Sequence, residues 1–293
     1  MPHKHKVYTG TAPAVKAMPV RQRILVAEDN PANQAVLRLQ LDILGFDADI
    51  ASDGAIALAL YQANVYPLIL ADRNMPKMDG LELTRAIRTI DDEHSASVPI
   101  IAITAVHYAE EIATCHEAGM NDALPKPIEL DVLRTMLMRW LPEVRVASRI
   151  SQDQAPNLNQ RSNVTISTQI LDLSCFRRVM GDIDTQKMRA LLNLFIKTAR
   201  SDLSSCRHQL DLQQWRAIAS TMHKLKSSAG ALGALRFSKL ATAIDEAVKA
   251  ERFTEISGLM VEIADALNEV ALAVEQATDL SLQASALSNS HAK

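Results

Sequence analysis

The 293-residue sequence is poor in aromatic residues and in cysteine. Aromatic residues make up 4% of the chain against 48% hydrophobic residues, so its cores must be built from aliphatic side chains and alanine. That composition suits helices and parallel strands. The three cysteines, Cys115, Cys175 and Cys206, are an odd number and lack metal-ligand spacing. They indicate buried free thiols in a reducing compartment, and neither a disulfide framework nor a zinc site.

Strong net charge and long apolar runs are also absent. The formal net charge is -3, which gives no global reason to expect binding to nucleic acid or to an anionic membrane. The second half of the chain has no basic recognition helix. No apolar run reaches the ~18 residues that a membrane span needs, and the N-terminus lacks the apolar segment of a signal peptide. We therefore expect a cytoplasmic protein without a membrane span.

Residues 23–141 alternate between short apolar runs and helical patterns. One helix start is explicit, because Asn30 can cap a helix whose first residue is Pro31, and Gly45 can end that helix. Five such alternations predict an α/β domain with a doubly wound, five-stranded parallel sheet. The predicted strands lie near residues 24–27, 48–50, 68–72, 99–104 and 123–125.

The second half of the chain has no strand pattern. Residues 142–168 are rich in Ser, Asn, Gln and Arg and read as a linker. Over 169–277 apolar residues recur at helical spacing, which predicts an all-α antiparallel bundle. We expect flexible tails at 1–22 and 278–293.

Polar residues follow the predicted strands at one edge of the sheet: Glu28 and Asp29, Asp72, Thr104 and Lys126. Each alone could be an ordinary strand end, a turn residue or a solvated lysine. Together they suggest phosphoryl chemistry. Three crowded carboxylates repel unless a cation lies among them, and magnesium prefers oxygen ligands. Asp72 could form an aspartyl phosphate, with Lys126 and magnesium offsetting the phosphoryl charge and Thr104 hydrogen-bonding to a phosphoryl oxygen.

The stretch 221–230 is a second candidate site. Met222, Leu225 and Ala229 share a face that would point into the bundle, which leaves His223 exposed on the neighbouring face. A neutral imidazole is nucleophilic near its ordinary pKa of ~6.5. Lys226 could stabilise phosphate charge there. The alternative is an ordinary surface histidine. The face of His223 also carries small or cationic residues: Ala219, Lys226, Ser227 and Gly230.

Residues 23–141 resemble a response-regulator receiver domain. The match lies in 24–30, 72–80, 101–105 and 124–127. The resemblance implies a flavodoxin-like strand order 2-1-3-4-5 and a cis Lys126–Pro127 peptide bond. It makes Asp72 the phosphoacceptor. The implied magnesium ligands are Glu28, Asp29, Asp72 and the backbone carbonyl of Asn74.

One position departs from the receiver pattern. Ala123 stands where receivers usually carry the Tyr or Phe that relays a conformational change. Phosphoryl transfer does not need that ring, but the usual relay to an output surface does.

Residues 170–276 resemble a histidine-containing phosphotransfer (HPt) domain. The core motif comprises His223, Lys226, Ser227, Gly230 and 232–234. A receiver followed by an HPt domain resembles the C-terminal end of unorthodox hybrid sensor kinases. The glycine-rich ATP-binding boxes of a kinase and its own dimerisation helix are not found in the sequence.

The combined motifs predict a two-component phosphorelay intermediate. An upstream histidine kinase would phosphorylate Asp72, and His223 would exchange the group with the receiver of a downstream response regulator. The chain would be a phosphotransfer protein, with magnesium-dependent self-phosphorylation from a phosphodonor but without a kinase domain. Two alternatives remain: a phosphorylation-gated binding adaptor, and a detached C-terminal part of a hybrid kinase. The Met1 start and the basic tail argue against the latter.

Overall fold

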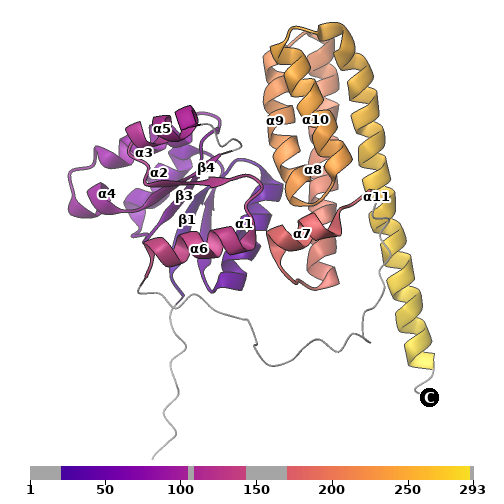
Figure 1. Ribbon diagram of the computed structural model, residues 1–293, viewed down its shortest axis with the longest axis horizontal. Coiled ribbons are helices and arrows are strands. Elements are labelled where there is room, and N and C mark those ends of the chain that lie inside the picture. Colours follow the sequence, from indigo (N-terminus) through magenta and orange to yellow (C-terminus); the bar gives the residue numbers. More distant parts are fainter. Residues whose placement is uncertain (1–20, 105–108, 143–169, 291–293) are drawn as a thin grey trace, which may run out of the picture.

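The computed structural model describes residues 21–104, 109–142 and 170–290. Most of the predicted N-terminal tail, the linker after residue 142 and the last three residues lie outside these ranges. Figure 1 shows two bodies, a sheet covered by helices and a bundle of longer helices. Each body corresponds to one of the two domains expected from the sequence.

The first body is built on five parallel strands in the order β2-β1-β3-β4-β5. The predicted doubly wound sheet and its strand order are therefore confirmed. The strands are β1 (Arg23–Ala27), β2 (Asp47–Ala51), β3 (Ile69–Asp72), β4 (Ile100–Thr104) and β5 (Asp122–Pro125).

Helices cover both faces of this sheet. Alternate strand residues such as Val26 and Leu70 pack under α1 and α6, whereas Leu25 and Ile69 pack under α2, α3 and α5. The helices are α1 (Pro31–Leu44), α2 (Gly54–Ala63), α3 (Gly80–Arg88), α4 (Glu93–Ser97), α5 (Ala109–Glu117) and α6 (Leu130–Trp140). Helix α1 begins at Pro31, as the sequence predicts.

The ends of α1 follow the capping pattern in the sequence. The Asn30 side chain accepts hydrogen bonds from the backbone N–H groups of Ala32 and Asn33, and Pro31 is the first helical residue. The helix ends at Gly45, whose φ of 91° lies in the left-handed region that glycine adopts without strain. These caps fix where α1 begins, directly after the acidic end of β1.

The second body contains α7 (Leu173–Met180), α8 (Thr185–Asp211), α9 (Trp215–Ala231), α10 (Leu235–Lys249) and α11 (Phe253–Ser290). Helices α8 to α11 form a four-helix bundle in which each contacts two neighbours. Phe195 and Phe237 meet edge to face in its core, with ring centroids 5.4 Å apart. All three cysteines are buried and unpaired, as predicted.

The C-terminal end differs from the expected tail over 278–293. Helix α11 continues to Ser290, so residues 278–290 are helical. No glycine or proline follows Gly258, so nothing in the sequence stops the helix there. Over the ranges that the structure describes, no helix is long and apolar enough to cross a membrane.

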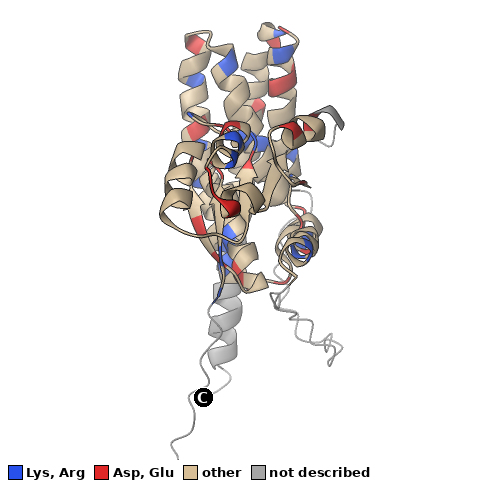
Figure 2. Cartoon of the chain, turned by 90° about the vertical axis from the view of Figure 1, so that its left-hand side faces the viewer, with Lys and Arg blue, Asp and Glu red and all other residues tan. Residues whose placement is uncertain are grey.

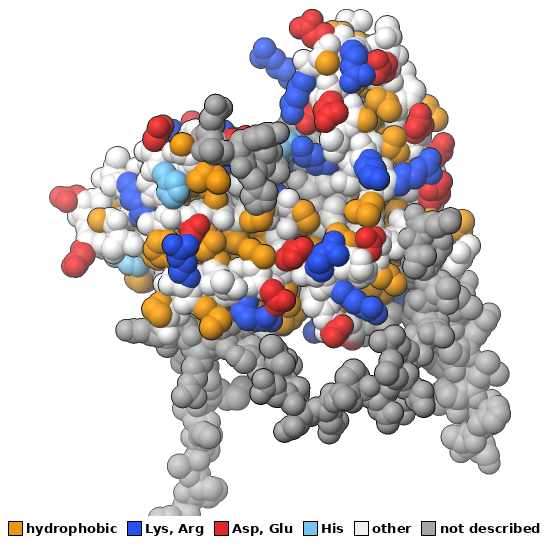
Figure 3. All heavy atoms as spheres, viewed as in Figure 1, with side chains coloured by type: hydrophobic (Ala, Val, Ile, Leu, Met, Phe, Trp, Pro, Cys, Tyr) orange, Lys and Arg blue, Asp and Glu red, His pale blue; other side chains and the backbone are white. Residues whose placement is uncertain are grey.

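The two bodies are in contact through α1 and α6. Helix α1 touches α7, α8 and α9, and α6 touches α7. Buried residues Ala32 and Val36 of α1 belong to the same apolar cluster as the bundle core. In Figure 3 side chains fill the space between the two ribbons. Acidic and basic residues are mixed over both bodies in the view of Figure 2.

Candidate functional site

Three carboxylates meet at the carboxyl end of the sheet. Oxygen atoms of Glu28, Asp29 and Asp72 all lie within 4.8 Å of one another. Glu28 and Asp72 are buried, with 1% and 6% of their surface exposed. They meet because β1 and β3 are adjacent parallel strands and end at the same edge.

The first helical turn of α1 orients Glu28. One of its carboxylate oxygens, Oε1, accepts hydrogen bonds from the Asn30 backbone N–H and the Asn33 side-chain amide, each at 3.1 Å. Neutral donors thus hold this oxygen, while the other is left to pair with a cation.

That cation is Lys126. Its Nζ donates to Glu28 Oε2 at 2.8 Å and to Asp72 Oδ2 at 2.6 Å. The lysine follows β5, and its backbone N–H donates to the Thr104 carbonyl at 2.8 Å. The Lys126–Pro127 peptide bond is cis, as the resemblance to receivers implies. Burial lowers the pKa of Lys126, but the carboxylates of Glu28 and Asp72 outweigh this effect and raise it above its ordinary value.

The negative charges of Asp72 and Asp29 are only partly compensated by their neighbours. Burial raises the pKa of Asp72 to about 7, although Lys126 and the Asn74 backbone N–H, 3.2 Å from Oδ1, act to lower it. Burial also raises the pKa of Asp29. Asp29 Oδ1 is buried, and no described residue donates a hydrogen bond to it. An all-oxygen set with an unsatisfied buried oxygen fits a hard divalent cation such as magnesium.

Thr104 is buried at the end of β4, beside the pocket. Its hydroxyl donates to Glu111 Oε2 at 3.2 Å, and the other oxygen of Glu111 pairs with Arg73 at 3.0 Å. Ala123 lies half-buried in β5 and pairs with Ala102 of β4. The structure therefore places a small methyl group at the position where receivers carry an aromatic ring.

His223 lies in the middle of α9 and is half-buried, not exposed as the helical pattern predicts. Burial lowers its pKa, and the Lys226 ammonium lowers it further, while Asp245 acts in the opposite direction. A lowered pKa keeps the imidazole neutral, and therefore nucleophilic, at pH 7.

A buried carboxylate on α10 holds two lysines near this histidine. Asp245 is 3% exposed, and its Oδ2 lies 3.7 Å from Lys226 Nζ and 2.8 Å from Lys249 Nζ. Sequence reasoning missed Asp245. The available signal was a carboxylate directly after Ile244, inside the apolar stripe of that helix.

The receiver-like body contacts the helix that carries His223. Lys224 Nζ lies 2.5 Å from Asp29 Oδ2, which joins α9 directly to the acidic pocket. The Lys126 ammonium is among the cations that lower the pKa of His223. The two predicted sites therefore face each other. Lys224 was also missed, because its spacing identifies its helix face but not the partner on that face.

Comparison with known families matches both bodies. Residues 24–138 match the response regulator receiver domain, and residues 190–279 match the Hpt domain. The chain therefore contains a response-regulator receiver domain followed by an HPt domain.

The relatives are sensor proteins. The chain is 29% identical to the sensor protein EvgS of Escherichia coli O157:H7 over 264 residues, which cover 88% of this chain and 20% of EvgS. It is 40% identical to the sensor histidine kinase RcsC of Salmonella typhimurium over 122 residues, 42% of this chain and 12% of RcsC. The chain thus spans about a fifth or less of these relatives.

A similar solved structure is the receiver domain of the sensor histidine kinase PA1611 from Pseudomonas aeruginosa PAO1. It is 40% identical and covers 41% of this chain and 97% of that domain, with a TM-score of 0.39. That structure holds a magnesium ion in its active-site cleft.

Proposed function

We propose that this chain is a phosphorelay intermediate that accepts a phosphoryl group on Asp72 and exchanges it through His223. The observation that carries the proposal is the pairing of the two sites. A buried aspartate held by Lys126 lies in an acidic pocket that an ion pair, Lys224–Asp29, joins to α9, and α9 carries a half-buried histidine with a lowered pKa. Such a pair suits reversible transfer between a carboxylate and an imidazole.

Asp72 is the proposed acceptor from an upstream histidine kinase. Its carboxylate would attack the phosphorus of a phosphohistidine, the Oδ–P bond would form and the N–P bond would break. Lys126 Nζ, 2.6 Å from Oδ2, would offset charge on the transferring oxygens. The names of the relatives, sensor proteins and a sensor histidine kinase, support a kinase as donor. No ATP chemistry is required of this chain.

We propose magnesium as the cofactor of this step. Glu28, Asp29, Asp72 and the backbone carbonyl of Asn74 would hold it. The buried oxygen set and the magnesium in the cleft of the PA1611 receiver support this assignment. When bound, the ion neutralises negative charge on the carboxylates and the phosphoryl oxygens. The Thr104 hydroxyl would hydrogen-bond to a phosphoryl oxygen.

His223 is the proposed donor to a downstream receiver. Lys226, held near it by Asp245, would compensate the charge of the phosphorylated imidazole. The neighbouring Ser227 and Gly230 are small, so another acidic pocket can approach the ring closely.

Two variants test the proposal. Asp72→Asn should block labelling by a phosphorylated kinase but leave His223 able to accept phosphate from another phosphorylated receiver. His223→Gln should label on Asp72 and pass nothing on. The label reports its own site, because an aspartyl phosphate is labile to base whereas phosphohistidine is labile to acid. Transfer from His223→Gln to a downstream receiver would contradict the proposal.

A further inference from the structure

We infer that Lys224 of the HPt domain acts as a tethered cation that competes with magnesium for Asp29, so that metal binding and the contact between α9 and the receiver domain weaken each other. Magnesium then loosens the contact between the two domains before any phosphoryl group arrives. This inference rests on the magnesium site of the proposed function and adds a regulatory role for a residue outside the receiver domain.

Lys224 provides a positive charge directly beside Asp29. Its Nζ lies 2.5 Å from Asp29 Oδ2, and the Asp29 side chain is only 4% exposed. Lys126 is bonded to the other two carboxylates of the pocket, Glu28 and Asp72. Burial raises the pKa of Asp29, and the hydrogen bond and charge of Lys224 act most strongly in the opposite direction. The ionised form of Asp29, which a metal ion needs, is therefore held by a residue of the bundle.

An ammonium and a metal ion cannot both bind well at this carboxylate. Magnesium requires oxygen ligands at about 2.0–2.1 Å in near-octahedral geometry. An ammonium has three N–H donors and no lone pair, so Lys224 cannot itself serve as a ligand. At 2.5 Å it takes up coordination space of Asp29 Oδ2, and its charge repels a cation bound through Oδ1. Lys224 must therefore leave Asp29 before this carboxylate can ligate magnesium at full strength.

A second carboxylate can hold Lys224 after it leaves Asp29. Asp202 is a half-buried residue of α8, in the same domain as Lys224. Burial raises the pKa of Asp202, the Lys224 ammonium acts to lower it, and Asp29 acts to raise it. Both carboxylates therefore act on the same ammonium, one from the receiver domain and one from the bundle. Lys224 thus has two alternative partners, and only Asp29 joins the domains.

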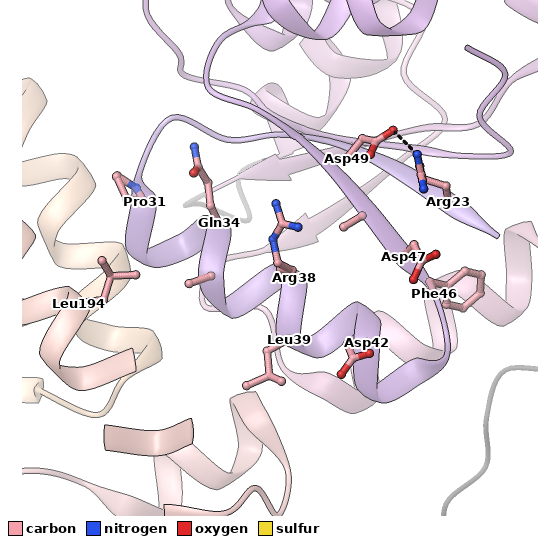
Figure 4. Close-up of a pocket in the computed structure, with 12 residues that line it drawn as sticks. Arg23, Pro31, Gln34, Arg38, Leu39, Asp42, Phe46, Asp47, Asp49 and Leu194 are labelled. Atoms are coloured by element: carbon pink, nitrogen blue, oxygen red, sulfur yellow. Dashed lines mark ion pairs between the residues drawn. The ribbon is translucent and has the colours of Figure 1, made fainter. Parts of the chain in front are cut away.

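The rest of the contact between the domains is loose enough for one ion pair to matter. Gln40 is fully buried, and its Nε2 donates to the Ile128 carbonyl of the receiver domain at 2.7 Å and to the Val179 carbonyl of α7 at 2.6 Å. Figure 4 shows a groove of about 810 Å³ between α1, the edge strand β2 and α8, so packing on this flank is incomplete. Opening of the Lys224–Asp29 pair therefore weakens the contact between the domains.

Thermodynamic linkage sets the size of the effect. Two groups that compete for one site lower each other's affinity by the same factor. If magnesium binds only when Lys224 is away from Asp29, removal of Lys224 tightens binding by the reciprocal of the fraction of molecules in which it is away. This factor is about two for a contact that is closed half of the time, and about ten for one that is closed about nine-tenths of the time.

The first experiment measures magnesium binding to the full-length chain by isothermal titration calorimetry, at constant ionic strength and without a phosphodonor. Lys224→Gln should bind magnesium about two- to tenfold more tightly than wild type. Lys224→Arg, which keeps the cation, should bind like wild type. Lys239→Gln, which removes a lysine from an exposed position of α10, should also bind like wild type. Equal affinities in wild type and Lys224→Gln would overturn the inference. A lack of magnesium binding in all of these chains would instead overturn the proposed cofactor.

The second experiment tests whether the effect passes through the contact between the domains. Gln40→Ala weakens that contact outside the pocket and should also tighten magnesium binding, whereas Gln62→Ala, at an exposed position of α2, should not. In the Lys224→Gln chain, Gln40→Ala should have no further effect, because nothing then couples the contact to the metal. Since Gln40 is buried, Arg178→Glu applies the same test at an exposed pair, in which Arg178 Nε lies 3.2 Å from Glu129 Oε1. Unchanged magnesium affinity in both Gln40→Ala and Arg178→Glu would overturn the coupling.

The third experiment follows the contact between the domains by small-angle X-ray scattering. Saturating magnesium should increase the radius of gyration of the wild-type chain, and potassium chloride at the same ionic strength should have a smaller effect, because it only screens the ion pair. The same addition of magnesium should leave the radius of gyration of Lys224→Gln unchanged, because the metal and the contact no longer compete. A wild-type chain that binds magnesium without any increase in its radius of gyration would overturn the inference.

Discussion

Replacing Lys126 with methionine tests the charge balance of the acidic pocket. Methionine keeps most of the length and apolar volume of lysine but removes the ammonium. In the structure the Lys126 side chain is 11% exposed, and its ammonium bonds to two buried carboxylates, at 2.6 and 2.8 Å. The substitution leaves three crowded carboxylates without the cation that contacts two of them. We expect a loss of folding stability that depends on pH.

The pH dependence follows from the pKa of Asp72. Burial raises this pKa from 3.8 to about 7, and a difference of about 3 pKa units corresponds to about 4 kcal/mol. A raised carboxyl pKa means that the folded protein binds the proton more tightly than the unfolded chain. The ionised group therefore destabilises the folded state above pH 7, and this cost disappears below about pH 4.

Removing Lys126 raises the pKa of Asp72 further, because the ammonium acts to lower it. Breaking a buried ion pair costs about 3–5 kcal/mol, and we expect a loss of this size at pH 8. At pH 5 a protonated Asp72 no longer needs the ammonium, but Glu28 still pairs with it, so the loss should fall to about half of this.

The assay is urea denaturation of both proteins at pH 5 and pH 8 without divalent cations. Lys77→Met is the matched control, since Lys77 also pairs with a carboxylate at the same edge of the domain but is 70% exposed. Its effect should be smaller and nearly independent of pH. Equal destabilisation by Lys126→Met at both pH values would refute the assigned charge balance.

Three further predictions concern the chemistry. Chelating divalent cations should abolish phosphorylation of Asp72 while leaving the fold intact; undiminished labelling in excess chelator would exclude the assigned metal site. An NMR pH titration should give His223 a pKa below the ordinary value of histidine. The neutral imidazole then stabilises the folded state fully above about pH 6.5, the pKa in the unfolded chain, and this stabilisation is lost as the pH falls towards the pKa in the folded protein. Asp245→Asn should slow phosphate uptake by His223 several-fold by releasing Lys226 and Lys249, and restoration by Asp245→Glu would separate positioning from folding.

The clustering of acidic residues at the strand ends was predictable from the sequence, because the strand order places these ends at the same edge of the sheet. A parallel sheet brings the carboxyl ends of adjacent strands together, so Glu28 and Asp72 could be placed near each other before any coordinates were known. The start of α1 was predictable for a local reason, the Asn30–Pro31 cap. The helical bundle followed from apolar spacing alone.

The junction between the domains was not predictable by these means. Gln40 and Lys224 are ordinary polar residues of amphipathic helices, and their spacing indicates a surface face. Their roles depend on which body lies against that face, and helical periodicity carries no information about this. The half-buried state of His223 was missed for the same reason, because the pattern of one helix does not show which neighbouring elements lie beside it.

The composition of the junction bears on how long docking can last. A contact that brings His223 to Asp72 also blocks the external receivers that must take the phosphoryl group next. Interfaces between domains of one chain resemble transient complexes. With an effective concentration on the order of a millimolar, an intrinsic Kd of about a millimolar leaves the domains docked about half of the time. The small apolar patch of α1, Ala32, Ala35, Val36 and Leu39, bordered by polar contacts, suits such a weak contact. A larger apolar interface would speed transfer from Asp72 to His223 only slightly, and it would prevent transfer from His223 to an external receiver.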